Sequence, residues 1–196
     1  MTSLTSSHAP GTAPHEELRL LIQSLAVIRG RVTLASGREA DYYVDLRRVT
    51  LHGGAAPLVG KVMLDMLAAA GLGPPHVEAV GGLTMGADPV AAALLHAAAN
   101  RGVHLDAFVV RKEAKAHGLQ RRVEGPDVRG RRVVALEDTS TTGGSLLTAV
   151  EALREAGADV IGVGVIVDRD TGARERIEAE GLAYHAAYGL DDLGLA

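Results

Sequence analysis

The chain lacks cysteine and tryptophan altogether, and its 196 residues include a single phenylalanine. Without cysteine there is no disulfide, no thiolate metal ligand and no cysteine nucleophile. With so few aromatic side chains the core must be built from aliphatic residues and alanine, for which the hydrophobic fraction of 47% is ample. The missing thiols fit a reducing compartment, so we expect a cytoplasmic protein.

Long hydrophobic runs and an excess of positive charge are also missing. No stretch approaches the roughly 18 apolar residues that a membrane-spanning helix needs. Residues 1–14 are polar and lack the apolar segment of a signal peptide. The net charge of −4 gives no reason to expect binding to nucleic acid or to a membrane. No two histidines have metal-ligand spacing with acids nearby, so we expect no protein-bound metal.

The pattern along the chain predicts a tail followed by one domain. Residues 1–14 are expected to form a disordered tail, because they bury too little surface to offset the entropy of ordering. The domain, residues 15–196, is expected to have a small N-terminal part at about 15–50 and a core at about 54–182. In the N-terminal part, apolar residues at helical spacing are followed by two predicted strands around a Ser-Gly-Arg turn.

The core alternates apolar strands with helices. Strands are predicted at 76–82, 105–111, 131–137 and 159–168, and helices at about 59–71, 87–100, 145–158 and 171–181. Continuous apolar strands separated by helices indicate a parallel sheet covered on both faces, which is a doubly wound α/β fold. Ligands of such sheets bind beyond the carboxyl ends of the strands, so functional residues are expected there.

The segment VVALEDTSTTGGS, residues 133–145, carries the strongest functional signal. An apolar strand is predicted to end at Glu137 and Asp138, and hydroxyl residues and two glycines then lead into a helix. Free N–H groups and the positive end of the helix dipole suit a phosphate, and glycines let the backbone approach it closely. No Gly-Lys-Ser/Thr follows, so the segment is not the P-loop of a nucleotide triphosphate site.

The position of two acids beside a phosphate site must be explained, because carboxylates repel a negatively charged phosphate. They fit hydrogen bonds to the hydroxyls of a sugar, or a position near Mg²⁺ or a developing positive charge. The alternative is a capped helix with two surface acids. The run of strand, acids, hydroxyls and glycines favours a sugar-phosphate site over that alternative.

A basic loop follows the second predicted core strand and contains Arg111, Lys112, Lys115 and His117. Most such runs are solvated surface loops. A long loop without structure inside a compact domain is, however, often a functional lid. Its cations could neutralise a departing pyrophosphate and exclude water.

Three segments together resemble a known family. Residues 133–145 are similar to the phosphoribosyl pyrophosphate (PRPP) signature of type I phosphoribosyltransferases. SGREADYYVDLR (36–47) and VRKEAKAHG (110–118) resemble the N-terminal motif and the mobile catalytic loop of the orotate phosphoribosyltransferases. The order and spacing of the three segments match, and the likeness runs from about residue 16 to 182.

The resemblance implies a type I phosphoribosyltransferase fold with an N-terminal hood, and a reaction of de novo pyrimidine (UMP) synthesis. Ribose 5-phosphate would pass from PRPP to N1 of orotate, giving orotidine 5′-monophosphate and pyrophosphate, with Mg²⁺ bound mainly through PRPP. Lys115 would be the catalytic lysine and would reach into the neighbouring site of a homodimer. Glu137 and Asp138 would hold the ribose and favour its developing positive charge.

The resemblance also assigns the substrate contacts. Arg169 would bind the orotate carboxylate and Thr141 the base; without the family, a surface pair of Asp168 with Arg169 is an equal alternative. The residues expected to bind PRPP are Arg111, Lys112, Lys115, His117, Glu137, Asp138, Thr139, Ser140, Thr141, Thr142, Gly143, Gly144 and Ser145.

The segment GGLTMGADP, residues 81–89, also follows a strand and could hold pyrophosphate through its main-chain N–H groups. Many relatives carry lysine where Met85 and Ala35 stand, and both lysines grip phosphates there. These departures bear on PRPP affinity rather than on the family.

Two alternatives to this enzyme are a PRPP-sensing regulator of nucleic acid, which the net acidity disfavours, and a sugar-phosphate enzyme of another α/β family.

Overall fold

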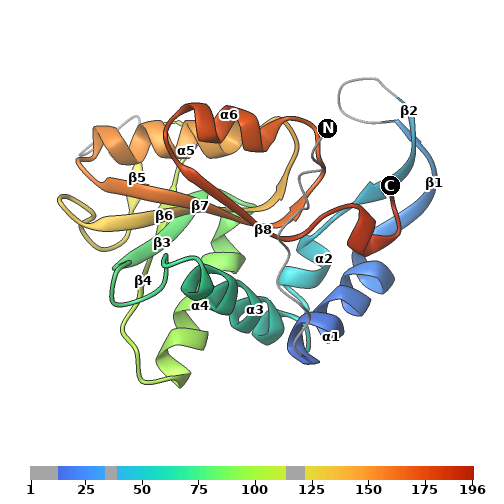
Figure 1. The fold of residues 1–196 in the computed structure, drawn as a ribbon, viewed down its shortest axis with the longest axis horizontal. Helices are drawn as coiled ribbons and strands as arrows, with labels where there is room; N and C mark the ends of the chain where they lie inside the picture. Colours follow the sequence, from blue (N-terminus) through green and yellow to red (C-terminus); the bar gives the residue numbers. More distant parts are fainter. Residues whose placement is uncertain (1–12, 34–38, 114–121) are drawn as a thin grey trace, which may run out of the picture.

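The computed structural model describes residues 13–33, 39–113 and 122–196. Its centre is a six-stranded sheet in the order β5-β4-β3-β6-β7-β8 (Figure 1). The strands are β3 (Ala79–Leu83), β4 (Asp106–Val110), β5 (Val123–Glu124), β6 (Arg132–Ser140), β7 (Asp159–Asp168) and β8 (Ala183–Tyr188). All neighbours are parallel except β4 and β5, which pair antiparallel at the edge. The predicted parallel α/β sheet is confirmed, whereas β5 and β8 were not predicted.

Helices cover both faces of the sheet, as expected for a doubly wound fold. The helices α3 (Ala56–Ala69) and α4 (Ala87–Asn100) lie on one face, and α5 (Gly144–Glu155) and α6 (Ala173–Ala179) on the other (Figure 1). Successive residues of β6 point to opposite faces, so Val134 and Leu136 join one buried cluster and Val133 and Ala135 the other. This double burial explains the continuous apolar runs of the core strands.

The N-terminal part forms a small subdomain beside the sheet (Figure 1). It contains α1 (Ala13–Leu21), the π-helix η1 (Ile22–Ala26), the antiparallel pair β1 (Val27–Thr33) and β2 (Glu39–Val44), and α2 (Arg47–Thr50). Helix α1 begins two residues inside the segment expected to be a tail, and residues 1–12 lie outside the described ranges.

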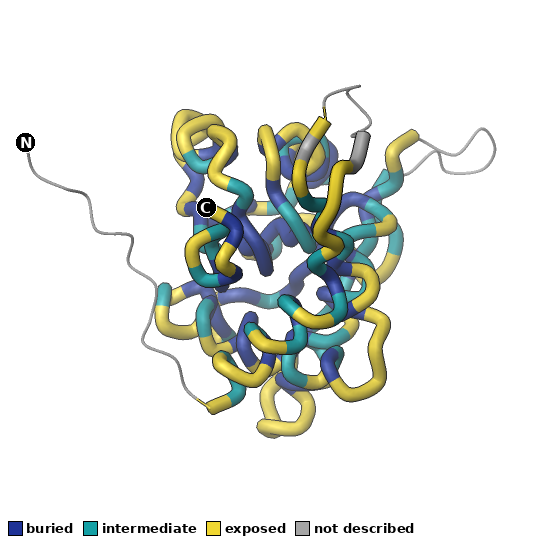
Figure 2. The backbone as a smooth tube through the Cα atoms, turned by 90° about the vertical axis from the view of Figure 1, so that its right-hand side faces the viewer, coloured by how far each residue is buried: buried dark blue, intermediate teal, exposed yellow. Residues whose placement is uncertain are grey.

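The C-terminal end of the chain packs on this subdomain through β8 and the short 3₁₀-helix η2 (Asp191–Leu193). The Tyr188 hydroxyl donates to the His15 carbonyl at 2.7 Å, and Gln23 donates to the Leu193 carbonyl at 3.1 Å. Because β8 pairs with β7, the sheet continues beyond residue 182, where the core was predicted to end. Figure 2 shows the buried backbone in the interior and the exposed backbone mainly in the outer turns and loops.

In the described part of the chain, no helix is both long and apolar enough to cross a membrane.

Candidate active site

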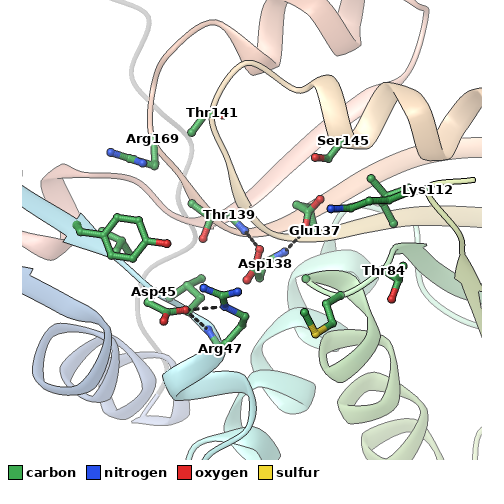
Figure 3. Close-up of a pocket in the computed structure, with 16 residues that line it drawn as sticks. Asp45, Arg47, Thr84, Lys112, Glu137, Asp138, Thr139, Thr141, Ser145 and Arg169 are labelled. Carbon is green, nitrogen blue, oxygen red and sulfur yellow. Dashed lines mark hydrogen bonds and ion pairs between the residues drawn. The ribbon is translucent and has the colours of Figure 1, made fainter. Parts of the chain in front are cut away.

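A cavity of about 600 Å³ lies where the loops after β3, β6 and β7 face residues 43–47 of the N-terminal subdomain (Figure 3). The structure thus brings the residues after several strands to one edge of the sheet, as the fold class predicted. Seven of the predicted site residues line this cavity: Lys112, Glu137, Asp138, Thr139, Thr141, Ser145 and Arg169.

Glu137 and Asp138 lie within β6, and this corrects the prediction that the strand ends at them. The strand continues to Ser140 because it keeps pairing with β7 as far as Asp168. Glu137 is buried, with 7% of its surface exposed. The Thr139 N–H donates to Asp138 Oδ1 at 2.7 Å, so the strand backbone itself orients this carboxylate.

Burial changes the proton affinity of the two acids. It raises the pKa of Glu137 to about 8, and the adjacent charge of Asp138 adds to this rise. Burial also raises the pKa of Asp138, although hydrogen bonds from Glu137 and the Thr139 N–H, and the charge of Arg47, oppose the rise. Near neutral pH the pair therefore retains a proton, and hydroxyl donors or a cation beside it would favour release of that proton.

The loop before α4 packs directly on the two acids. A Cβ atom added to Gly86 would lie 2.2 Å from Glu137 Oε1 and 2.8 Å from Asp138 Oδ1, so the two acids or the loop would have to shift to admit a side chain. Thr84 donates to Asp88 Oδ2 at 2.7 Å, which fixes the start of α4 against the same loop. Met85 lines the cavity with 66% of its surface exposed.

The loop between β6 and α5 offers main-chain donors to the cavity. Gly143 caps α5 with a left-handed φ of +74°, and no side chain caps the helix. The first-turn N–H groups therefore remain available to an anion at the positive end of the helix dipole. Arg176 of α6 donates to the Thr142 carbonyl at 2.5 Å and holds the loop from outside.

Thr141 and Arg169 follow β6 and β7 and lie together at one end of the cavity (Figure 3). The Arg169 N–H donates to the Ser140 carbonyl at 3.1 Å, which joins the two strand ends. The Arg169 guanidinium lies 5.9 Å from the centroid of the Tyr42 ring. A cation held between a strand end and an aromatic ring suits a planar anion.

Some predicted residues do not line the cavity. Ser140 is buried, and its hydroxyl donates to Asp168 Oδ1 at 3.0 Å, so the side chain is engaged inside the fold. Arg111 lies 3.9 Å from Glu124 across the sheet edge. Thr142, Gly143 and Gly144 frame the loop without lining the cavity. Lys115 and His117 fall outside the described residues.

Sequence reasoning missed the wall contributed by the N-terminal subdomain. Tyr43, Asp45 and Arg47 all line the cavity. Asp45 Oδ1 accepts a hydrogen bond from Arg47 Nε at 2.9 Å, and the Arg47 charge acts on Asp138. The signal was present in the segment 36–47, which was used to identify the family but not to assign residues.

Comparisons with known proteins identify the family of this chain. The model of the phosphoribosyl transferase domain matches residues 73–180. The orotate phosphoribosyltransferase of Streptomyces avermitilis is 69% identical over 175 residues, which are 89% of this chain and 93% of that protein. That of Corynebacterium glutamicum is 55% identical over 97% of this chain and 99% of its own length. The structure of Mycobacterium tuberculosis orotate phosphoribosyltransferase with PRPP has a TM-score of 0.79 and 51% identity, covering 93% of this chain and 99% of that one.

Proposed function

The chain belongs to the orotate phosphoribosyltransferases of the phosphoribosyltransferase family, and from this premise we propose which of its residues carry out the reaction. The enzyme transfers ribose 5-phosphate from PRPP to orotate, giving orotidine 5′-monophosphate and pyrophosphate. The observation that carries the residue assignment is the cavity in which the buried Glu137, the half-buried Asp138, the uncapped start of α5 and Arg169 meet. The proposal includes a cytoplasmic location, which the cysteine-free sequence fits.

The 5′-phosphate binds in the loop 139–145 at the start of α5. The N–H groups beyond Gly143 supply donors, and the hydroxyls of Thr139, Thr141 and Ser145 line the same cavity. Gly143 supports this assignment. It caps α5 in a left-handed conformation and has no side chain that would cover the N–H groups.

The ribose lies against Glu137 and Asp138. Their carboxylates accept hydrogen bonds from its hydroxyls, and their negative charge favours the positive charge that develops at C1′ as pyrophosphate departs. Both acids are poorly hydrated, so this electrostatic stabilisation is stronger than it would be in water. The charge of Arg47 favours the ionised form of Asp138.

Orotate binds between Thr141 and Arg169. A guanidinium can form two parallel hydrogen bonds with the orotate carboxylate, which gives direction as well as charge neutralisation. The position of Arg169 after β7, next to the end of β6, supports this placement because the base must lie beside the ribose.

Pyrophosphate departs toward the loop before α4 and the basic loop that begins after β4. Lys112 lines the cavity, and so do Thr84, Met85 and Gly86 of the loop before α4. Arg111, Lys115 and His117 complete the cationic set in the proposal, with Lys115 as the catalytic lysine. Met85 contributes no charge, so the main chain and the basic loop carry this part of the site.

Mg²⁺ would enter with PRPP and would be bound mainly through it. Across the described ranges, no group of three or more histidine or acidic side chains is placed to hold a metal alone. Asp45, Glu137 and Asp138 are the acids of the cavity wall that could assist. When bound, the metal neutralises charge on the leaving pyrophosphate.

The functional unit is a homodimer, and a second copy covers the groove formed by α2, α3 and α4. This groove has a volume of about 950 Å³, and four alanines and two prolines are among the residues that line it. Leu51 at its edge has 72% of its surface exposed. Helix α4 begins at the Gly86 loop of the cavity, so an interface here adjoins the active site, as a loop shared between subunits requires.

The proposal is tested by following the loss of orotate absorbance in the presence of PRPP and Mg²⁺. We expect turnover that requires all three components. Adenine and hypoxanthine serve as control acceptors; turnover with either purine and none with orotate would contradict the assignment of Arg169 and Thr141.

A further inference from the structure

A buried polar network lies behind the orotate end of the cavity and does not line it. It joins Ser140 of β6, Asp168 of β7 and Tyr184 of β8, which are exposed by 2%, 9% and 3%. The Ser140 hydroxyl donates to Asp168 Oδ1 at 3.0 Å, and the Tyr184 hydroxyl is hydrogen-bonded to the Ser140 hydroxyl. The single hydroxyl proton of Ser140 goes to Asp168, so Tyr184 is the donor to Ser140.

The Tyr184 hydroxyl remains a hydrogen-bond donor at every pH at which the enzyme works. Burial, together with the negative charge of Asp168, raises the pKa of Tyr184 well above its ordinary value. The phenol therefore keeps its proton throughout the pH range in which enzymes work. A buried hydroxyl is costly unless it is hydrogen-bonded, and in this network its partner is Ser140.

The network ends on the turn that carries Arg169. Asp168 Oδ1 accepts a second hydrogen bond from the Asp170 N–H at 3.0 Å. Asp170 has φ +50°, a left-handed conformation that no other non-glycine residue adopts in the described parts of the chain. This carboxylate therefore stabilises a turn that is otherwise unfavourable for a residue with a side chain.

Each of the two residues proposed to contact orotate directly follows a member of the network in the chain. Thr141 follows Ser140, and Arg169 follows Asp168, while the Arg169 N–H donates to the Ser140 carbonyl at 3.1 Å. We propose that Tyr184 is a positioning residue for orotate: through Ser140 and Asp168 its hydroxyl fixes the strand ends that aim Thr141 and Arg169. This inference rests on the proposed binding of orotate by those two residues.

The structure allows the hydroxyl to be tested separately from the ring. Arg174 donates to the Tyr184 carbonyl at 3.0 Å, and its guanidinium lies 4.8 Å from the ring centroid. Neither contact needs the hydroxyl, so Tyr184→Phe removes the donor to Ser140 and keeps the packing. The same strand offers a matched control, because the Tyr188 hydroxyl is also hydrogen-bonded but donates to the His15 carbonyl outside the network.

Steady-state kinetics with each substrate varied in turn test the proposal. Tyr184→Phe should raise KM for orotate roughly threefold to tenfold, the effect of one hydrogen bond, with kcat and KM for PRPP changed less than twofold. Tyr188→Phe should leave all three constants unchanged. An unchanged KM for orotate in Tyr184→Phe, or an equal rise in both KM values, overturns the proposal. Absence of orotate turnover by the wild-type enzyme would instead overturn the proposed function itself.

A double-mutant cycle tests the route through Ser140. Ser140→Ala removes that hydrogen bond from the other side, together with the one to Asp168, and should raise KM for orotate by at least as large a factor. The double variant should be no worse than the more affected single variant, because both changes interrupt one chain of hydrogen bonds. Multiplying effects would show that Tyr184 acts independently of Ser140 and would overturn the route. Ser140→Ala also tests the network if Tyr184→Phe fails to fold.

Discussion

At the scale of single residues, Glu137 has the clearest measurable signature. Its pKa is about 8 in the folded protein, against an ordinary value of 4.5. Between these two values the folded state binds a proton that the unfolded chain has released. The free energy of unfolding therefore falls as pH rises from about 4.5 to about 8, by at most about 1.4 kcal/mol per pH unit.

Glu137→Gln should flatten this slope, because the amide stays neutral at every pH. We expect the variant to gain thermal stability relative to the wild type as pH rises from 5 to 8, with no further gain above about 8. Thermal unfolding across that range measures the effect. Glu151→Gln on the exposed side of α5 is the control and should follow the wild type. Parallel curves for Glu137→Gln and the wild type would contradict the buried proton.

At the scale of elements, the junction of the β3 loop with α4 leaves no room for a side chain. Gly86→Ala would place a methyl group 2.2 Å from Glu137 Oε1, so the loop or the acid must move, at a cost of about 1–3 kcal/mol. We expect KM for PRPP to rise about tenfold or more. The control is Gly54→Ala, whose Cβ would contact His52 at an ordinary 3.5 Å. Equal kinetics for the two variants would show that the loop adapts freely.

The core elements could be predicted from the sequence because their signals are local. Helix 87–100 and strand 159–168 match α4 and β7, since each combines an unbroken apolar pattern with clear ends. Strand β8 was missed because its alanines and histidine are not typical of strands, and its pairing with β7 decides its conformation.

In the candidate site, too, residues within one short segment could be predicted, whereas those that depend on distant contacts could not. The run from Glu137 to Ser145 could be recognised because one short segment holds both the acids and the helix start. The wall formed by Asp45 and Arg47 could not be placed, since its contact with Asp138 joins residues about ninety positions apart. That Ser140 points into the fold could not be foreseen either, because it depends on Tyr184 in an unpredicted strand.

At the scale of the whole molecule, the proposed dimer depends on the groove over α3 and α4. Leu51→Glu places a charge on an edge residue that would be buried between subunits, and it should convert dimers to monomers. Light scattering after size exclusion measures the mass. Leu20→Glu is the control, because Leu20 is also an exposed leucine, at 52%, but lies on α1 away from the groove. A dimer that survives Leu51→Glu would place the interface elsewhere.

Sharing of the basic loop predicts complementation between two inactive variants. Lys115→Ala and Asp138→Asn should each lose nearly all activity as pure proteins. In randomly mixed dimers, about a quarter of all sites should combine an intact Asp138 with the partner's intact lysine. Co-refolding the two variants and measuring orotate turnover tests this expectation. No recovered activity would mean that the lysine serves the site of its own subunit.

The contacts between the two ends of the chain have a consequence for biosynthesis. Hydrogen bonds from Tyr188 to the His15 carbonyl and from Gln23 to the Leu193 carbonyl join segments more than 160 positions apart. A ribosome delivers α1 first and these partners last, so the N-terminal subdomain waits for most of translation before it can dock. Because residues 43–47 of that subdomain form one wall of the cavity, a nascent chain cannot enclose substrate until this C-terminal segment has been made.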